Sequence, residues 1–216
     1  MDWEEYHATT PYEDPALRAR AVKMELVLQL WKSGMVGFSE ESLGDLALFT
    51  VVKKHVWEES LSPTNGSRGA GENAPGWKRS SRLVWDCRKI NHLFRAPPKM
   101  PLGSAASFSF WDLSDQVVSA DQRPVSFTAD LPDWFYRILL PETLTKYFTF
   151  ADVELADFVQ YAGEKGEDIS VPPSAQYLCL LVLPMGFSWA PFIAHTLMQD
   201  IVENAMAGVV SARVSD

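Results

Sequence analysis

Asp130 is the acidic residue whose surroundings best suit metal chemistry. Residues 125–129 alternate apolar and polar side chains, which predicts a strand that ends at Asp130. Pro132 interrupts this strand two residues later, and a helical turn is expected to follow with Asp133 as its N-cap. A carboxylate at the end of a strand, beside a break in the backbone, contributes little to packing but can reach a metal ion. Asp130 is therefore the candidate metal ligand.

Ser188 is a second candidate for chemistry, because residues 186–190 read Gly-Phe-Ser-Trp-Ala between an expected strand and an expected helix. This context resembles the nucleophile elbow of serine hydrolases. Such an enzyme needs an acid and then a histidine downstream of the serine. Only His195 follows, seven residues on in the same helix, so it cannot turn back onto Ser188. A hydrolase is therefore a distant alternative.

Lys53 and Arg82 belong to the one block of the chain with an excess of positive charge, although the whole chain has a net charge of −9. Residues 53–101 contain 10 basic and 4 acidic residues, a net of +6. Residues 1–52 contain 4 basic and 9 acidic residues, and residues 102–216 contain 5 and 15. The block is either a solvated face or a local anion-binding lobe.

A β-hairpin with a long tip is expected to carry this basic block. Residues 46–52 and 82–87 are β-prone runs, and each qualifies as a strand. Between them, residues 60–76 are rich in glycine and contain two prolines, with almost no apolar side chains. That composition predicts a flexible loop rather than a linker between domains.

Residues 178–198 predict a buried strand, a tight turn and a helix. The apolar run meets Pro184, Met185 and Gly186, after which the apolar residues take helical spacing and Pro191 opens the helix. The stretch is uncharged, but Pro184, Gly186 and Pro191 in its middle argue against a membrane span. No membrane association is expected.

The rest of the sequence indicates an intracellular protein that is not secreted. With 216 residues and 47% hydrophobic content, the chain can form one core or two small lobes. Residues 1–14 are expected to be a loose acidic tail, unlike a signal peptide, and an amphipathic helix is expected from Pro15 to Ser33. Cys87 and Cys179 lack the spacing of a disulfide framework or a zinc site.

The hairpin residues resemble the fingers hairpin of reverse transcriptases. That family has a basic pair, a hairpin tip and then Arg-hydrophobic-Val-x-Asp-x-Arg-x-hydrophobic-Asn. Lys53 and Lys54 match the basic pair, and Arg82, Asp86, Arg88 and Asn91 match the second part. The resemblance implies that Lys53 and Arg82 neutralise an incoming triphosphate. Asp86 and Arg88 are expected to pair and to hold the hairpin base.

Residues 130–136 resemble the first catalytic motif of the same family, Asp-x-x-Asp-x-aromatic-aromatic. The resemblance implies that Asp130 binds Mg²⁺, with the carbonyl oxygen of Leu131 as a second ligand. It also implies that Phe135 is the aromatic gate under the sugar of the incoming nucleotide. A bulky ring there leaves no room for a 2′-hydroxyl, so deoxynucleoside triphosphates are the expected substrates.

The turn at Gly186 matches a third family pattern, Leu-Pro-x-Gly-x-x-x-Ala-Pro, which grips template and nucleotide. Met185 stands where the family usually has glutamine. The backbone grip of Gly186 is unaffected by this change, but a polar side-chain contact to the nucleotide is lost. Met185 and Gly186 are nevertheless expected to contact nucleotide.

The resemblance implies an α+β fold, with the fingers and a partial palm of a right-hand polymerase. Residues 1–45 would be the acidic tail and helix, residues 46–101 the fingers-like hairpin region, and residues 102–216 the partial palm. The partners would be an RNA or DNA template with its primer, and deoxynucleoside triphosphates. The family's Tyr-x-Asp-Asp motif, expected 25–30 residues after Pro191, is not in the sequence. The chain is therefore expected to be a retroelement polymerase fragment that is inactive alone.

Two other interpretations stay open beside the RNA-directed DNA polymerase. One is a remnant that binds nucleic acid without catalysis. The other is a protein-interaction module that uses the acidic surface of residues 102–216.

Overall fold

The protein combines helices with two small antiparallel sheets, an α+β fold in the general sense that the sequence predicts. The computed structural model describes residues 2–12, 14–58, 76–100, 102, 130–150 and 152–205, and only the backbone of residues 52–58 and 76–81. The predicted strand at residues 125–129 lies outside these ranges. Among the described residues, no helix is both long enough and apolar enough to cross a membrane.

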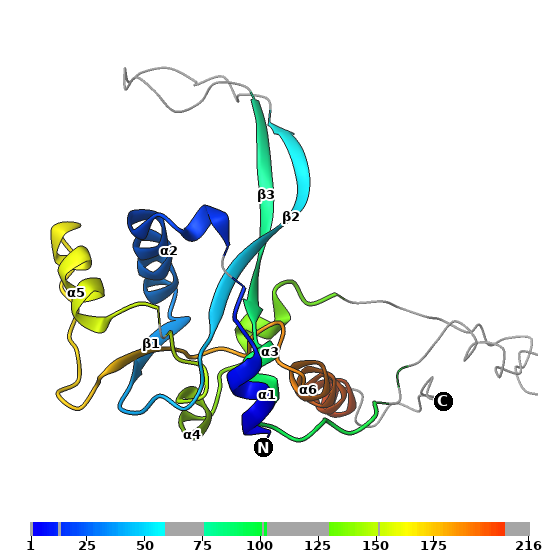
Figure 1. The fold of residues 1–216 in the computed structure, drawn as a ribbon. Helices are drawn as coiled ribbons and strands as arrows, with labels where there is room; N and C mark the ends of the chain where they lie inside the picture. The colour runs from blue at the N-terminus through cyan, green and yellow to red at the C-terminus, as the bar shows by residue number, and fades with distance from the viewer. Residues whose placement is uncertain are drawn as a thin grey trace, which may run out of the picture.

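The predicted hairpin is present and longer than its sequence pattern indicates. Strand β2 (Ala47–Glu58) pairs with β3 (Gly76–Asp86), and Ala47 lies opposite Asp86 at the base. The register shifts between Val52 and Lys54, as at a β-bulge. Figure 1 shows the hairpin extending from the rest of the fold as a long arm.

The second sheet joins distant parts of the chain. Strand β1 (Val36–Ser39) pairs with β4 (Tyr177–Leu180), so the strand predicted before the Gly186 turn is confirmed. Single bridges add Leu139 opposite Val182 and Thr149 opposite Cys179. β4 is therefore buried at the centre of the body.

The N-terminus differs from the predicted loose tail. Helix α1 (Trp3–Ala8) forms because the Asp2 carboxylate accepts a hydrogen bond from the Glu5 backbone amide at 3.1 Å. The helix packs beside α3 (Arg88–Asn91), where the Asp2 amide donates to the carbonyl of His92 at 2.8 Å. The ammonium group of Lys89 also lies over the ring of Tyr6, 4.7 Å from its centroid.

The helix expected from Pro15 to Ser33 is divided in two. Asp14 caps a 3₁₀ turn, η1 (Pro15–Leu17), by accepting from the Ala16 amide at 2.9 Å. The α-helix itself, α2 (Arg20–Lys32), begins only after Ala19, whose backbone is extended. The predicted cap is therefore present, but it opens a separate short turn.

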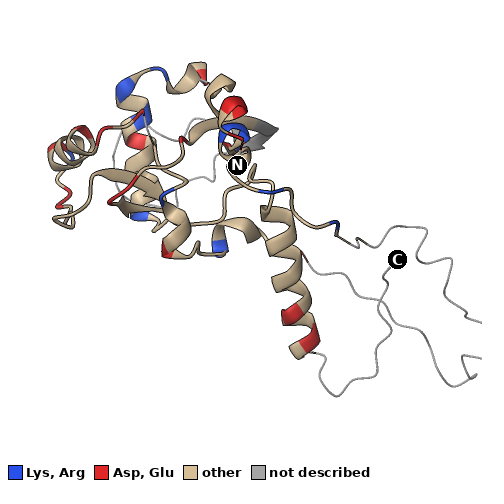
Figure 2. Cartoon of the chain, turned by 60° about the horizontal axis from the view of Figure 1, so that its bottom comes forward, with Lys and Arg blue, Asp and Glu red and all other residues tan. Residues whose placement is uncertain are grey.

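Three further α-helices belong to the described part of the body. They are α4 (Glu142–Thr145), α5 (Leu155–Glu164) and α6 (Ala190–Ala205), and α6 begins at the predicted place with Pro191 in its first turn. Figure 2 shows two acidic positions, in red, toward the C-terminal end of α6, where the sequence has Asp200 and Glu203.

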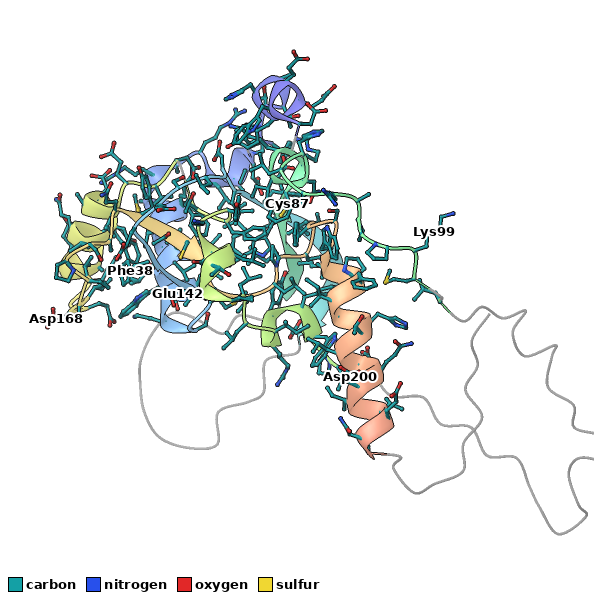
Figure 3. All side chains as sticks on the ribbon, turned by 90° about the horizontal axis from the view of Figure 1, so that it is seen from below. Phe38, Cys87, Lys99, Glu142, Asp168 and Asp200 are labelled. Atoms are coloured by element: carbon teal, nitrogen blue, oxygen red, sulfur yellow. The ribbon has the colours of Figure 1, made fainter. Side chains whose placement is uncertain are left out.

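The core joins the hairpin base to the body. Trp85 of β3 is 1% exposed, and its ring meets Phe150 edge to face at 5.8 Å. Phe94, Phe148 and Phe187 form a second aromatic group, with ring centroids of neighbours 5.0 to 6.5 Å apart. The arm is therefore anchored through its base. Cys87 is buried in the interior, near the start of α6 (Figure 3), and both cysteines are free thiols.

Candidate functional site

The Gly186 turn lies directly against the hairpin base. The Trp85 amide donates to the carbonyl oxygen of Met185 at 3.1 Å. Gly186 has φ +126°, and a Cβ atom there would lie 2.2 Å from the carbonyl oxygen of Trp85. Both the backbone conformation and the close approach therefore require glycine at this position.

Asn91 fastens the same turn from α3. Its side-chain Nδ2 donates to the carbonyl oxygen of Gly186 at 3.1 Å, and its Oδ1 accepts from the amide of Ser188 at 2.8 Å. Asn91 is part of the hairpin motif, but the sequence analysis gives it no role. Its contacts link two motifs that are almost a hundred positions apart.

The serine-nucleophile interpretation receives no support from this geometry. Ser188 is held through its backbone by Asn91. The buried Nε2 atom of His195 has no hydrogen-bond partner in the described part of the chain, so it does not bond to the Ser188 hydroxyl. These two residues therefore lack the nucleophile–base hydrogen bond that a triad requires.

The short helix η3 (Trp134–Arg137) bridges the hairpin and α6. The Tyr136 hydroxyl donates to the carbonyl of Leu83 at 2.6 Å, and the indole Nε1 of Trp134 donates to the carbonyl of Ala194 at 3.1 Å. Burial and the negative charge of Asp133 raise the pKa of Tyr136, and the positive charge of Arg82 opposes them. The hydroxyl therefore stays a proton donor at neutral pH.

The expected pair of Asp86 and Arg88 is present at the hairpin base. The Asp86 carboxylate accepts from Arg88 Nε at 2.9 Å and Nη2 at 2.7 Å, and from the Tyr12 amide at 2.7 Å. Burial alone would raise the pKa of Asp86, but the hydrogen bonds and the charge of Arg88 outweigh it and lower the pKa. This carboxylate holds structure together.

Arg82 is exposed on β3, opposite Val51. Its neighbour Leu83 accepts a hydrogen bond from the Tyr136 hydroxyl through its backbone carbonyl. Arg82 therefore lies where η3 meets the hairpin. Lys53 lies on β2 at the register shift, two residues beyond the cross-strand partner of Arg82. The side chain of Lys53 lies outside what the structure describes.

The residues predicted to bind Mg²⁺, Asp130 and Leu131, lie just before η3. The residue predicted to contact the nucleotide sugar, Phe135, lies within η3. Asp130 and Leu131 are exposed, and Phe135 is half-buried against the core. Asp133 does occupy the N-cap position, but its backbone is left-handed, with φ 56°, and its side chain makes no capping hydrogen bond. Asp133 is therefore the N-cap residue, as predicted, but without the side-chain hydrogen bond that usually accompanies this position.

The donors at Asp130 match Mg²⁺ in kind but are few. A carboxylate and a backbone carbonyl are the oxygen ligands that Mg²⁺ accepts, together with waters and substrate phosphates. Within the described ranges, no group of three or more His, Cys, Asp or Glu side chains is placed to hold a metal ion. Asp130 and Leu131 therefore offer the kind of oxygen ligand that Mg²⁺ takes, but the described residues alone do not complete a site.

An open groove of about 620 Å³ lies beside the hairpin base. Its walls include Tyr12, Phe49, Val84, Arg88 and Gly186. Tyr12 enters from the N-terminal segment, which the sequence analysis treats as a loose tail. The groove is therefore the part of the site that sequence reasoning misses.

The structure brings together three of the predicted segments: the hairpin with Arg82, η3 with Phe135, and the turn with Met185 and Gly186. Asp130 is four residues before η3 and exposed. A search of protein-family models finds no match to this chain, and a search of curated proteins finds no significant relative.

Proposed function

We propose that this chain is the nucleotide- and template-binding part of an RNA-directed DNA polymerase of the reverse transcriptase type. One observation carries the proposal. The three segments with reverse-transcriptase-like motifs are far apart in sequence, yet the hairpin base touches both the Gly186 turn and η3. Motif matches that arose by chance would have no reason to meet in space.

The chemistry at this junction suits a nucleoside triphosphate. Arg82 offers an exposed planar guanidinium, which binds phosphate oxygens in pairs, and Lys53 adds a second cation from the neighbouring strand. Asp130 and the Leu131 carbonyl would hold Mg²⁺, which neutralises charge on the phosphates as they react. Positioning and charge neutralisation are the main contributions that a protein makes to phosphoryl transfer.

The Gly186 turn and Phe135 would set the geometry and selectivity of the same site. The contact of Gly186 with Trp85 fixes the turn relative to the hairpin. Met185 in this turn would then contact the nucleotide. The half-buried Phe135 ring packs against the core, five residues after the exposed Asp130. It would exclude a 2′-hydroxyl, and the substrates would be deoxynucleotides.

Binding of a primer–template and of Mg²⁺ with a deoxynucleoside triphosphate to the 216-residue chain tests the proposal. The double variant Lys53→Ala, Arg82→Ala is expected to weaken both at least tenfold. The slope of log affinity for primer–template against log salt concentration should become less steep by about two. Each lost phosphate contact reduces the magnitude of this slope by about 0.9.

The matched control is Lys23→Ala, Lys32→Ala on α2, which removes the same amount of charge. Lys23 pairs with Asp152, and Lys32 pairs with Glu167 at 2.5 Å, so neither belongs to the proposed site. This control should change affinity less than twofold. Equal losses from both double variants would show that the charge acts generically and would refute the assignment.

A further inference from the structure

The N-terminal segment crosses the outer side of the hairpin base and is tied to it at several points. The Tyr12 amide donates to Asp86 at 2.7 Å, and Arg88 Nη2 donates to the carbonyl of Thr10 at 3.4 Å. Two residues on, the Asp14 carboxylate accepts from the amide of Thr50 at 2.8 Å and from its hydroxyl at 3.1 Å. Figure 1 shows this stretch running beside the lower part of the hairpin.

Tyr12 presents its ring to the groove as a result of these ties. The ring is 48% exposed and meets Phe49 edge to face, with centroids 5.3 Å apart and planes at 75°. Both residues line the groove of about 620 Å³, and Val84 extends the apolar wall. The amide contact to Asp86 holds the backbone of Tyr12 and the Phe49 ring supports its side chain before any ligand arrives, so stacking on Tyr12 costs little ordering entropy.

The charges around the groove favour a base over a triphosphate. Among the described residues that line the groove, the cation is Arg88, and its guanidinium is already committed to Asp86. A triphosphate carries three to four negative charges and needs several free donors. An unpaired nucleotide in a strand carries one phosphate per base, and aromatic side chains stack on bases of any sequence.

We infer that Tyr12, together with Phe49, receives an unpaired nucleobase of the template strand in this groove. The inference rests on the proposed function and adds a binding residue from a segment that carries none of the three motifs. Tyr12 would act through its aromatic face. Its hydroxyl would be dispensable, and the N-terminal segment would form part of the template path.

The test compares a blunt DNA duplex with the same duplex carrying a single-stranded 5′ extension, and with an abasic version of that extension. Fluorescence anisotropy gives the affinity of the full 216-residue chain for each. The unmodified chain and Tyr12→Phe should bind the extended duplex at least fivefold more tightly than the blunt one. Tyr12→Ala should lose this gain in affinity while binding the blunt duplex as before. For the unmodified chain, the abasic extension should not increase the affinity over that of the blunt duplex.

Trp3→Ala is the matched control, because Trp3 is also 48% exposed and its ring also stacks, on His7 at 6.1 Å. It lies on α1, outside the groove, and should keep the full gain. A gain that persists in Tyr12→Ala, or one equally large for the abasic extension, overturns the inference. So does an equal loss of blunt and extended binding in Tyr12→Ala, which would indicate a structural role only.

The outcomes separate this inference from the proposed function. If the blunt duplex binds through Lys53 and Arg82 but the extension adds nothing, Tyr12 is not a stacking residue and the proposed function stands. If neither duplex binds, both fall. If a free deoxynucleoside triphosphate competes away the extension's gain, the groove takes the incoming base and the assignment to the template strand is wrong.

Discussion

The close contact at the Gly186 turn and the surface ion pair between α2 and α5 are two very different kinds of contact. At the turn, backbone meets backbone with no space between them, and a single added carbon would lie 2.2 Å from the Trp85 carbonyl oxygen. Between the helices, exposed side chains pair across the surface: Arg20 reaches Asp157 at 2.9 Å, with the two side chains 60% and 41% exposed. The close contact fixes the position of the Gly186 turn against the hairpin. The exposed ion pair adds only a weak attraction between α2 and α5.

This difference shows where the molecule requires precise geometry. The three candidate segments converge at the junction that has no spare space, where Asn91 satisfies two backbone groups of the turn. Helices α2 and α5 also share the buried core through Leu28 and Phe158, so their surface ion pair only adds to that packing. Substitutions at the two junctions should therefore differ in effect by several-fold, in a definite order.

Gly186→Ala should have the largest effect. The new Cβ atom clashes with Trp85, and alanine is strained at φ +126°, so a loss of about 3 kcal/mol or more in the free energy of unfolding is expected. Gly166→Ala is the control, because Gly166 has φ +80° with nothing within 4 Å of the added atom. It should cost only about 1 kcal/mol. Denaturant titration measures both, and equal losses would mean that the tight contact is absent.

Asn91→Ala should rank second. It leaves the carbonyl of Gly186 and the amide of Ser188 without their partner, which costs about 1–3 kcal/mol for such groups. Asn91→Asp keeps the acceptor for Ser188 and loses the donor to Gly186, so it should be destabilising but less so than alanine. Thermal melts compare the three proteins. Unchanged melting of Asn91→Ala would show that the turn does not depend on this clamp.

The Asp86 carboxylate makes the same region sensitive to acid. Its pKa is lowered in the folded protein, because the hydrogen bonds and the charge of Arg88 outweigh burial, which acts to raise it. A lowered pKa contributes stability that is present above the unfolded value of about 3.9 and is lost as pH falls through the folded value. Asp86→Asn should therefore be less stable at pH 6 and should lose less further stability between pH 5 and 3. Parallel pH curves for the two proteins would contradict this.

Arg20→Ala should have the smallest effect. Its ion pair with Asp157 is exposed and screened by salt, so the free energy of unfolding should change by less than about 1 kcal/mol. Urea titrations at 50 mM and 500 mM NaCl provide the check. A loss as large as that of Asn91→Ala would remove the distinction between the two junctions.

Local patterns predicted the elements that depend on neighbouring residues in the sequence. The hairpin follows from two β-prone runs around a glycine-rich loop, and the start of α6 follows from Pro191. The pairing of Asp86 with Arg88 was also foreseeable, because the two lie two residues apart at the end of a strand. The predicted strand before Asp130 and the predicted phosphate contact of Lys53 stay predictions, because the structure describes neither residues 125–129 nor the Lys53 side chain.

Contacts between distant segments were not predictable from those patterns. The six-residue helix α1 is too short to be stable alone and is stabilised by packing on α3, as the Asp2–His92 and Lys89–Tyr6 contacts show. The clamp made by Asn91 and the groove wall made by Tyr12 depend on tertiary contacts across 95 and 74 positions. Asp133 looks like an N-cap in sequence and takes that position in η3, but its backbone is left-handed and its side chain makes no capping hydrogen bond.

Photolabelling with a photoreactive deoxynucleoside triphosphate tests most directly whether the hairpin, η3 and the turn form one nucleotide site. The full chain is labelled with Mg²⁺ and primer–template present, and the modified peptides are mapped by mass spectrometry. Labels are expected on β3, on residues 130–137 and on residues 183–189. Unlabelled deoxynucleotide should suppress them, and Lys53→Ala, Arg82→Ala should reduce them strongly. Labels confined to α2 and α5, or labels that neither competition nor the double variant reduces, would contradict the account.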